Sequence, residues 1–216
     1  MSQPTRILIV DDHPIVRCGL AQLISQHPEL VLCGEAADTT EALEAVASLC
    51  PDLVIVDISL KGESGIDLIK QIKSRDRKVK ILVCSMHEEL YFAERVLHAG
   101  ALGFVNKEQA MDKLLDAIFT VLQDKIYLSV QMSERLLHRS VGLSQLGENP
   151  IDCLSDRELE VLELIGEALT TGEIAEKLYL SRKTVETHRE NIKAKLRLKN
   201  GAELMRWAVQ WVLQKK

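Results

Sequence analysis

Short apolar runs alternate with longer amphipathic stretches through the first 125 residues of the chain. The runs, such as 7–10 and 53–56, are rich in branched residues and are typical of buried parallel strands. Between them, apolar residues recur at helical spacing. The pattern predicts an α/β fold, a five-stranded parallel sheet with helices on both faces. Strands are predicted at 6–10, 31–35, 53–57, 80–84 and 103–106, and helices at 14–26, 39–48, 64–74, 88–98 and 109–124.

The pattern changes after residue 125, where strand-like runs stop. One helix is predicted near 129–139, and residues 140–150 contain two glycines, a proline and little charge, which is typical of a linker. Every later signal is helical, with helices predicted near 155–168, 171–178, 181–196 and 200–213. We therefore expect an α/β domain at 1–125, a helix and linker at 126–150, and a small all-α domain at 151–216.

Capping signals support several of these helix starts. Pro14 stands at the first position of a predicted helix, where its missing N–H is not needed. Three further starts have capping-box spacing, in which a Ser, Thr or Asp is followed three residues later by Glu. These pairs are Asp38 with Glu41, Ser155 with Glu158 and Thr170 with Glu173.

The composition favours a soluble globular protein. Hydrophobic residues make up 46% of the chain and charged residues 27%, so each domain can build a core. No apolar run approaches the roughly 18 residues that a membrane helix needs, and the N-terminus leads into the first strand without an apolar export segment. The five cysteines are scattered without C-x-x-C spacing. We therefore expect a cytoplasmic protein with reduced thiols and no membrane partner.

Polar side chains stand where four of the predicted strands end: Asp11 and Asp12, Asp57, Ser85 and Lys107. Because the carboxyl ends of parallel strands meet at one edge of the sheet, we expect them to form one pocket. Carboxylates suit a hard cation such as Mg²⁺, a lysine adds fixed positive charge, and one carboxylate can act as a nucleophile. The set therefore indicates phosphoryl transfer. A lone aspartate at a strand end is more often a solvated loop residue, but five such residues favour a site.

Residues 5–125 resemble the receiver domain of bacterial two-component response regulators. The matching residues are Asp11, Asp12, Asp57, Ser85, Phe104 and Lys107. The resemblance implies a flavodoxin-like, doubly wound topology. It also implies that Asp57 accepts a phosphoryl group from a cognate histidine kinase, and that Mg²⁺ is bound by Asp12, Asp57 and the backbone carbonyl of Ser59, with Asp11 acting largely through water.

The resemblance further implies how the domain responds to phosphorylation. Ser85 would move to hydrogen-bond the phosphate and Phe104 would rotate inward behind it, although simple core packing is the alternative for Phe104 in the resting state. The new charge, about −1.5 to −2, would bias an equilibrium between two conformers. One departure lies beside the site: Leu60-Lys61 stand where the family usually has Met-Pro, while Gly65 still matches. This loop is where phosphoryl lifetime is expected to differ.

Basic residues are concentrated in the C-terminal part. Residues 177–199 contain eight Lys or Arg and two Glu, whereas the first 150 residues are net acidic, which indicates two separate roles. Residues 170–196 have helix–turn–helix form: a short helix, a turn at Tyr179-Leu180, and a second helix that Ser181 can cap. An ordinary solvated amphipathic helix is the simpler alternative, and periodicity alone does not exclude it.

The second of these helices has two different faces. Val185, Ile192 and Leu196 share one narrow stripe and should face the core. The opposite face presents Lys183, Thr187, Glu190, Asn191 and Ala194. Such a face is typical of a recognition helix, in which polar side chains read bases and flanking basic residues meet phosphates.

Residues 154–213 resemble the LuxR/NarL-type DNA-binding domain, a four-helix module. The matching string is Leu154-Ser155-x-Arg157-Glu158-x-Glu160-Val161-Leu162, Glu173-Ile174-Ala175, Ser181-x-Lys183-Thr184-Val185-x-x-His188 and Ile192-x-x-Lys195-Leu196. The resemblance implies major-groove reading of double-stranded promoter DNA, with phosphate contacts from residues such as Thr184 and Lys195. It departs at Ala168, where Gly is usual, and at Gly172, where Lys or Arg is common. The expected DNA-contacting residues are Arg182, Lys183, Thr184, Thr187, His188, Glu190, Asn191 and Lys195.

Taken together, the two resemblances predict a response regulator of the NarL/FixJ type. Phosphorylation of Asp57 would control dimerisation and promoter binding. Trp207 and Trp211 lie four apart on the last helix in a stripe that is expected to be mostly core, and the resemblance implies that part of this helix meets a second copy in a homodimer. One competing hypothesis is a Mg²⁺-dependent phosphohydrolase, which the short strand-to-helix loops disfavour because they leave no lid. The other is an interaction module that is never phosphorylated, which the complete Asp/Ser/Lys set disfavours. We therefore expect a transcription regulator rather than an enzyme.

Overall fold

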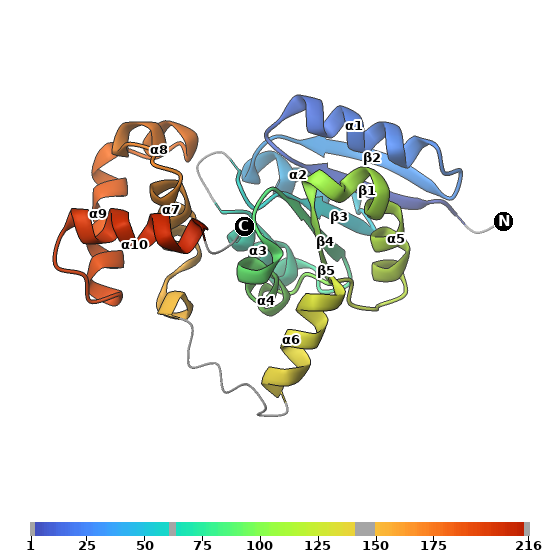
Figure 1. Cartoon of the computed structure of the whole chain (residues 1–216). Coiled ribbons are helices and arrows are strands. Elements are labelled where there is room, and N and C mark those ends of the chain that lie inside the picture. The colour runs from blue at the N-terminus through green and yellow to red at the C-terminus, as the bar shows by residue number, and fades with distance from the viewer. Residues whose placement is uncertain (1–2, 61–63, 141–149, 214–216) are drawn as a thin grey trace. The chain divides into compact units, whose positions relative to one another are not determined.

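The computed structural model describes residues 3–60, 64–140 and 150–213 of the chain (Figure 1). These residues form two compact units, 1–143 and 144–216. The first unit combines a sheet with helices, and the second is helical. The predicted linker at 140–150 lies almost entirely outside the described residues, as does Lys61.

A five-stranded parallel sheet in the order β2-β1-β3-β4-β5 is the centre of the first unit. The strands are β1 (Thr5–Val10), β2 (Leu30–Ala36), β3 (Leu53–Val56), β4 (Lys80–Ser85) and β5 (Gly103–Asn106). Val10 pairs with Val56, and Val56 with Val83. This register brings the residues that follow β1 and β3 to the same edge of the sheet, as the sequence predicts.

Helices cover both faces of the sheet (Figure 1). Alternate strand residues, among them Ile7, Ile9 and Ile55, pack with apolar residues of α1 and α5 in one cluster. The residues between them, such as Leu8 and Val54, are equally buried and point to the opposite face, where α2, α3 and α4 pack side by side. These helices are α1 (Pro14–Ser25), α2 (Thr39–Leu49), α3 (Gly65–Arg75), α4 (Glu89–Ala99) and α5 (Ala110–Leu122).

The chain after α5 stays attached to the sheet. Tyr127 forms a parallel bridge with Gly103 of β5, a pairing that the sequence pattern does not predict. The next helix, α6 (Val130–Ser140), contacts α4 and buries Met132. Its start is held by Glu89 of α4, whose carboxylate accepts a hydrogen bond from Ser129 N at 2.7 Å. The segment after α5 therefore packs as part of the first unit.

The second unit packs its helices around one apolar core. Leu159, Leu162 and Ile165 of α7, with Val185 and Ile192 of α9, are fully buried. Both predicted capping boxes form, at Ser155/Glu158 and Thr170/Glu173. The elements are a short 3₁₀ turn η2 (Pro150–Cys153), α7 (Asp156–Gly166), α8 (Thr171–Lys177), α9 (Arg182–Lys195) and α10 (Gly201–Leu213).

The predicted elements agree with the structure to within one or two residues at most ends, and two local predictions need correction. At the start of α2, Asp38 accepts from Glu41 N, but the Glu41 carboxylate accepts from Ala37 N rather than from Asp38 N. The reciprocal capping box is therefore incomplete, because the Glu41 side chain reaches one residue further back. Leu196, expected in the core stripe, is only half-buried because it lies just beyond the last residue of α9.

Candidate functional site

Two aspartates and a lysine form the centre of a side-chain cluster at the sheet edge. Lys107 Nζ lies 2.6 Å from Asp57 Oδ2 and 2.6 Å from Asp11 Oδ2. Asp11 and Asp57 are almost completely buried, with 2% and 3% of their surface exposed. Lys107 is the first residue of η1 (Lys107–Gln109), the 3₁₀ turn that follows β5. One ammonium therefore faces two nearly buried carboxylates.

The pKa values of Asp11 and Lys107 reflect both burial and the charges nearby. Burial raises the pKa of Asp11, and the nearby Asp57 carboxylate raises it further, while the hydrogen bond from Lys107 acts in the opposite direction. Burial opposes the charged form of Lys107, but the two aspartates outweigh this effect, so its pKa lies above the ordinary value. The lysine is therefore a fixed positive charge at physiological pH.

His13 joins this cluster, although the sequence does not single it out. Its Nδ1 lies 2.6 Å from Asp12 Oδ1 and 3.4 Å from Asp11 Oδ1, and its backbone N–H donates to Asp11 Oδ1. The ligand atoms of Asp11, Asp12, His13 and Asp57 all lie within 4.8 Å of one another. In the sequence, the only indication that His13 belongs to the cluster is its position next to the two aspartates. That position does not determine which way the His13 ring points.

The cluster is chemically suited to a divalent cation. Asp57 Oδ1 is buried and has no hydrogen-bond partner among the described residues. An unpaired buried carboxylate oxygen is costly, so such an atom indicates a ligand that binds it. Carboxylate oxygens are the donors that Mg²⁺ prefers in proteins. The acidic cluster therefore fits the cation that the fold class implies.

Two loops meet beside Asp57. A Cβ on Gly65 would collide with the Asp57 backbone carbonyl, so only glycine lets the start of α3 approach this closely. On the other side, Ser59 Oγ hydrogen-bonds His87 Nε2 at 2.8 Å, and the His87 ring stacks on Phe92 of α4 with centroids 4.4 Å apart. This link between the loops after β3 and β4 is not predicted from the sequence.

The two residues expected to respond to phosphorylation are both buried. Ser85 is fully buried at the end of β4, and its Oγ accepts a weak hydrogen bond of 3.4 Å from His87 N. Phe104 is 2% exposed in β5, where it packs as a core residue. Leu60, at one of the departures from the family pattern, is also buried. All three residues are therefore buried positions of the first unit.

The recognition-helix face of α9 is largely exposed. Thr184 and His188 are half-buried, and the other six predicted DNA-contacting residues are exposed: Arg182, Lys183, Thr187, Glu190, Asn191 and Lys195. Thr184 closes the N-terminal cap, because its backbone N–H donates to Ser181 Oγ at 3.0 Å. Burial lowers the pKa of His188, whose Nδ1 lacks a hydrogen-bond partner within the described ranges.

One of the predicted DNA contacts already has a protein partner. Lys195 Nζ lies 2.6 Å from Glu158 Oε2, and the same oxygen accepts from Ser155 N at 2.7 Å. Beside it, Arg157 donates to Leu178 O at 2.6 Å and pairs with Glu160. The Lys195 bond ties α9 to α7, and the Arg157 bond ties α7 to the residue that ends α8. Lys195 therefore has a structural role that its position in the sequence does not reveal.

No helix within 3–60, 64–140 or 150–213 combines the length and apolar character needed to span a membrane.

Two protein-family models match the chain. The response regulator receiver domain matches residues 7–119, and the bacterial regulatory proteins of the luxR family match residues 152–208. The oxygen regulatory protein NreC of Staphylococcus epidermidis is 35% identical over 211 residues, which cover 95% of this chain and 97% of that protein. NreC of Staphylococcus aureus is also 35% identical, over 210 residues.

Solved structures with the same fold include RcsB of Salmonella. RcsB of Salmonella typhimurium matches with a TM-score of 0.69 at 28% identity, covering 97% of this chain and 98% of that one. RcsB of Salmonella enterica serovar Typhimurium, bound to promoter rprA in the presence of the phosphomimetic BeF3−, matches with a TM-score of 0.63 at 29% identity. That match covers 96% of this chain and 99% of that one.

Proposed function

The chain belongs to the bacterial response regulators that join a receiver domain to a LuxR-type DNA-binding domain, and from this premise we propose that Asp57 is its phosphoacceptor. A member of this family is a phosphorylation-controlled transcription regulator and not an enzyme. The proposal rests on one observation: Lys107 engages Asp57 Oδ2 and leaves Oδ1 without a partner among the described residues.

The division of roles between the two oxygens supports a specific reaction. Oδ1 of Asp57 attacks the phosphorus of a phosphohistidine on the kinase, so an O–P bond forms and the P–N bond breaks. The imidazole leaves with the electron pair and takes a proton from water. Lys107, already 2.6 Å from Asp57, stays within reach of the new phosphate and offsets part of its charge. The product is an aspartyl phosphate on the first unit.

Mg²⁺ is the cation that we propose for the acidic cluster. Asp12, Asp57 and the backbone carbonyl of Ser59 would hold it, with Asp11 acting largely through water. When bound, the cation neutralises charge on the phosphoryl oxygens. The clustering of the ligand atoms of Asp11, Asp12 and Asp57 supports this assignment.

Ser85 and Phe104 are proposed to carry the response away from Asp57. The hydrogen bond of 3.4 Å between His87 N and Ser85 Oγ is too long to hold the hydroxyl firmly, so Ser85 is free to bond a phosphate oxygen instead. Phe104 would then fill the space behind the shifted loop. Each step biases an equilibrium between two conformers, and a coupling of about 1–3 kcal/mol is typical of such linkage.

The exposed face of α9 is proposed to bind promoter DNA. Its polar centre, Thr187, Glu190 and Asn191, would read base edges in the major groove, while Arg182 and Lys183 at its start would lie near the backbone. RcsB, a solved relative, is bound to promoter DNA in two of its structures, which supports this role. A homodimer would place two such helices about one helical turn apart. The proposed domains are 1–125 and 151–216, joined by 126–150.

Intact-mass spectrometry after incubation with acetyl phosphate and Mg²⁺ tests the phosphoacceptor. Wild-type protein should gain the mass of one phosphoryl group, and Asp57→Asn should gain none. Asp67→Asn, at an exposed position on α3, is the matched control and should be labelled like the wild type. Labelling of Asp57→Asn at wild-type yield would overturn the assignment.

A further inference from the structure

The side chain of Arg182 lies across the bare backbone of Gly172. Arg182 is the first residue of α9 and Gly172 the second residue of α8. A Cβ placed on Gly172 would meet the Arg182 guanidinium at 3.3 Å from Nη2 and at 3.5 Å from both Cζ and Nε. All three distances fall within 0.2 Å of one another, so the guanidinium presents its flat side to the glycine.

A glycine inside a helix, as at position 172, calls for a structural explanation. Within a helix, glycine costs about 1 kcal/mol relative to alanine, because it loses more backbone freedom and adds no side-chain contact. The φ of Gly172 does not lie in the left-handed region that would demand glycine. What its missing side chain provides is space, and the guanidinium of Arg182 occupies that space.

The charge of Arg182 is not paired with a carboxylate in the described part of the chain. Arg182 is exposed and makes no hydrogen bond or ion pair with any residue in the described part of the chain. Other cations of the same unit are engaged by carboxylates. Examples are Lys177 with Glu167 at 3.6 Å, Lys193 with Glu190 at 2.9 Å and Lys195 with Glu158 at 2.6 Å. A positioned guanidinium without a carboxylate is available for an external anion.

The location of Arg182 identifies that anion. In a helix–turn–helix the first helix crosses the DNA backbone and the N-terminal part of the second enters the major groove. The guanidinium lies where the starts of these two helices come together, beside α8 rather than on the outward centre of α9. Its planar, forked donors match the oxygens of a phosphodiester.

We propose that Arg182, whose guanidinium packs against Gly172, contacts a phosphate of the DNA backbone. This contact takes the place of one from the first helix of the motif. Arg182 then fixes the register of the protein on the duplex and does not read a base. Gly172 is a positioning residue, because its lack of a side chain sets where the guanidinium lies. This inference rests on the proposed DNA-binding function.

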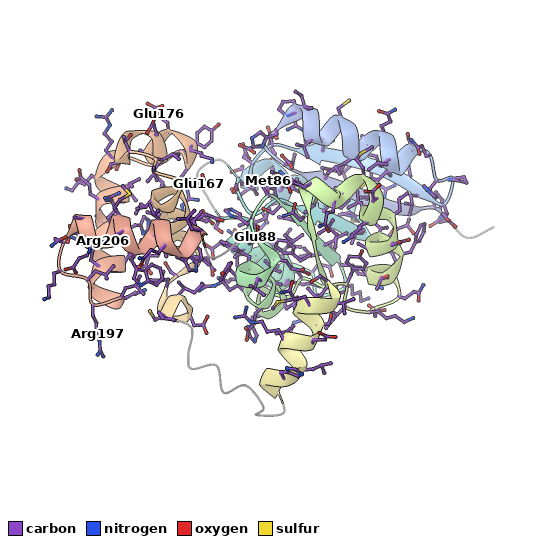
Figure 2. All side chains as sticks on the ribbon, viewed as in Figure 1. Met86, Glu88, Glu167, Glu176, Arg197 and Arg206 are labelled. Carbon is purple, nitrogen blue, oxygen red and sulfur yellow. The ribbon has the colours of Figure 1, made fainter. Side chains whose placement is uncertain are left out.

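A salt series with a compensating substitution tests the proposal. The full chain, treated with acetyl phosphate and Mg²⁺, is titrated against a labelled mixed-sequence duplex long enough for two half-sites. Arg182→Ala should weaken binding roughly eightfold at about 0.1 M salt and reduce the slope of log K against log salt by about 0.9 per subunit. Arg206→Ala removes an exposed arginine from α10 (Figure 2) and should leave the slope unchanged.

The double variant Gly172→Lys/Arg182→Ala distinguishes a phosphate contact at this point from a general loss of charge. A lysine at position 172 places its ammonium in the space that Arg182 has left, so the slope should return to near the wild-type value. An unchanged slope in Arg182→Ala, or a folded double variant that does not recover, would overturn the inference. If the wild type binds no duplex at any salt, the proposed DNA-binding function is wrong as well as the Arg182 contact. If the wild type binds but the slope does not respond to Arg182→Ala, only the Arg182 contact is wrong.

Discussion

Lys195 Nζ lies 2.6 Å from Oε2 of Glu158, the oxygen that also closes the capping box at the start of α7. One carboxylate therefore holds both the first turn of α7 and the last turn of the recognition helix α9. Glu158 is 3% exposed, so removing Lys195 leaves a nearly buried carboxylate without its charge partner. This shared contact therefore fixes the end of α9 against the start of α7.

The Glu158 contact predicts an acid-sensitive second unit. Burial opposes the charge of Glu158, but the bonds from Lys195 and Ser155 outweigh it and hold its pKa below the ordinary 4.5. A carboxyl whose pKa is lowered by folding contributes stability above its unfolded value, and this contribution is lost as pH falls through the folded pKa. The free energy of unfolding should therefore fall more steeply below about pH 4.5 in the wild type than in Glu158→Gln.

Tryptophan fluorescence measures this directly, because Trp207 and Trp211 are the only tryptophans of the chain and both lie in α10. Glu176→Gln, on the exposed side of α8 (Figure 2), is the matched control. An identical pH dependence in wild type and Glu158→Gln would show that the shared carboxylate contributes nothing to stability.

Replacing Ala168 by glycine should stabilise the second unit. Ala168 follows α7 with a φ of +65°, a left-handed conformation that strains any residue with a Cβ. Ala168→Gly should raise the free energy of unfolding of the second unit by about 0.5–1 kcal/mol, since relief of strain exceeds the entropy that glycine adds to the unfolded chain. Ala194→Gly, at a helical position of α9, should have the opposite sign. Denaturant titration followed by tryptophan fluorescence compares the two, and destabilisation by both would refute the strain argument.

Two glycines of the first unit predict opposite responses to alanine. At Gly65 the new Cβ would collide with the Asp57 carbonyl, so α3 must move and we expect a loss of about 1–3 kcal/mol. At Gly19, inside α1, a new Cβ meets nothing within 4 Å, so Gly19→Ala should stabilise by about 0.5–1 kcal/mol. Both tryptophans lie in the second unit, so unfolding of the first unit is followed by circular dichroism, as the transition that tryptophan fluorescence does not report. Equal effects at both positions would contradict the close packing at Asp57.

We expect removal of divalent cations to abolish phosphorylation of Asp57. With Lys107 as the only cation contacting Asp57 in the described part of the chain, the carboxylate cluster repels an incoming phosphodonor unless a divalent ion offsets it. Incubation with EDTA should abolish the mass gain from acetyl phosphate, and excess Mg²⁺ should restore it. Full labelling in EDTA would show that the cluster does not need a cation.

The sheet and the centre of the pocket follow from local patterns. Buried strands have a clear composition, parallel strands end at one edge, and so Asp11, Asp57 and Lys107 are brought together by the topology alone. Helix starts were equally predictable where a cap depends on residues three apart, as at Ser155 and Thr170.

Contacts that depend on side-chain direction were not predictable in this way. The bond from Ser59 to His87 joins two loops whose conformations no periodicity specifies. The pair of Glu158 with Lys195 spans 37 positions and two helices, and the seating of Arg182 on Gly172 depends on how α8 and α9 pack. In each case the residue type was visible in the sequence, but its partner is determined by tertiary packing.

Recovery of genomic DNA measures whether phosphorylation of Asp57 controls DNA binding. Wild-type protein and Asp57→Asn, each with and without acetyl phosphate and Mg²⁺, are incubated with sheared DNA of the source organism, and bound fragments are sequenced. Acetyl phosphate should enrich a defined set of promoter fragments with the wild type and change nothing with Asp57→Asn. Equal phosphate-dependent enrichment with both proteins would contradict control through Asp57.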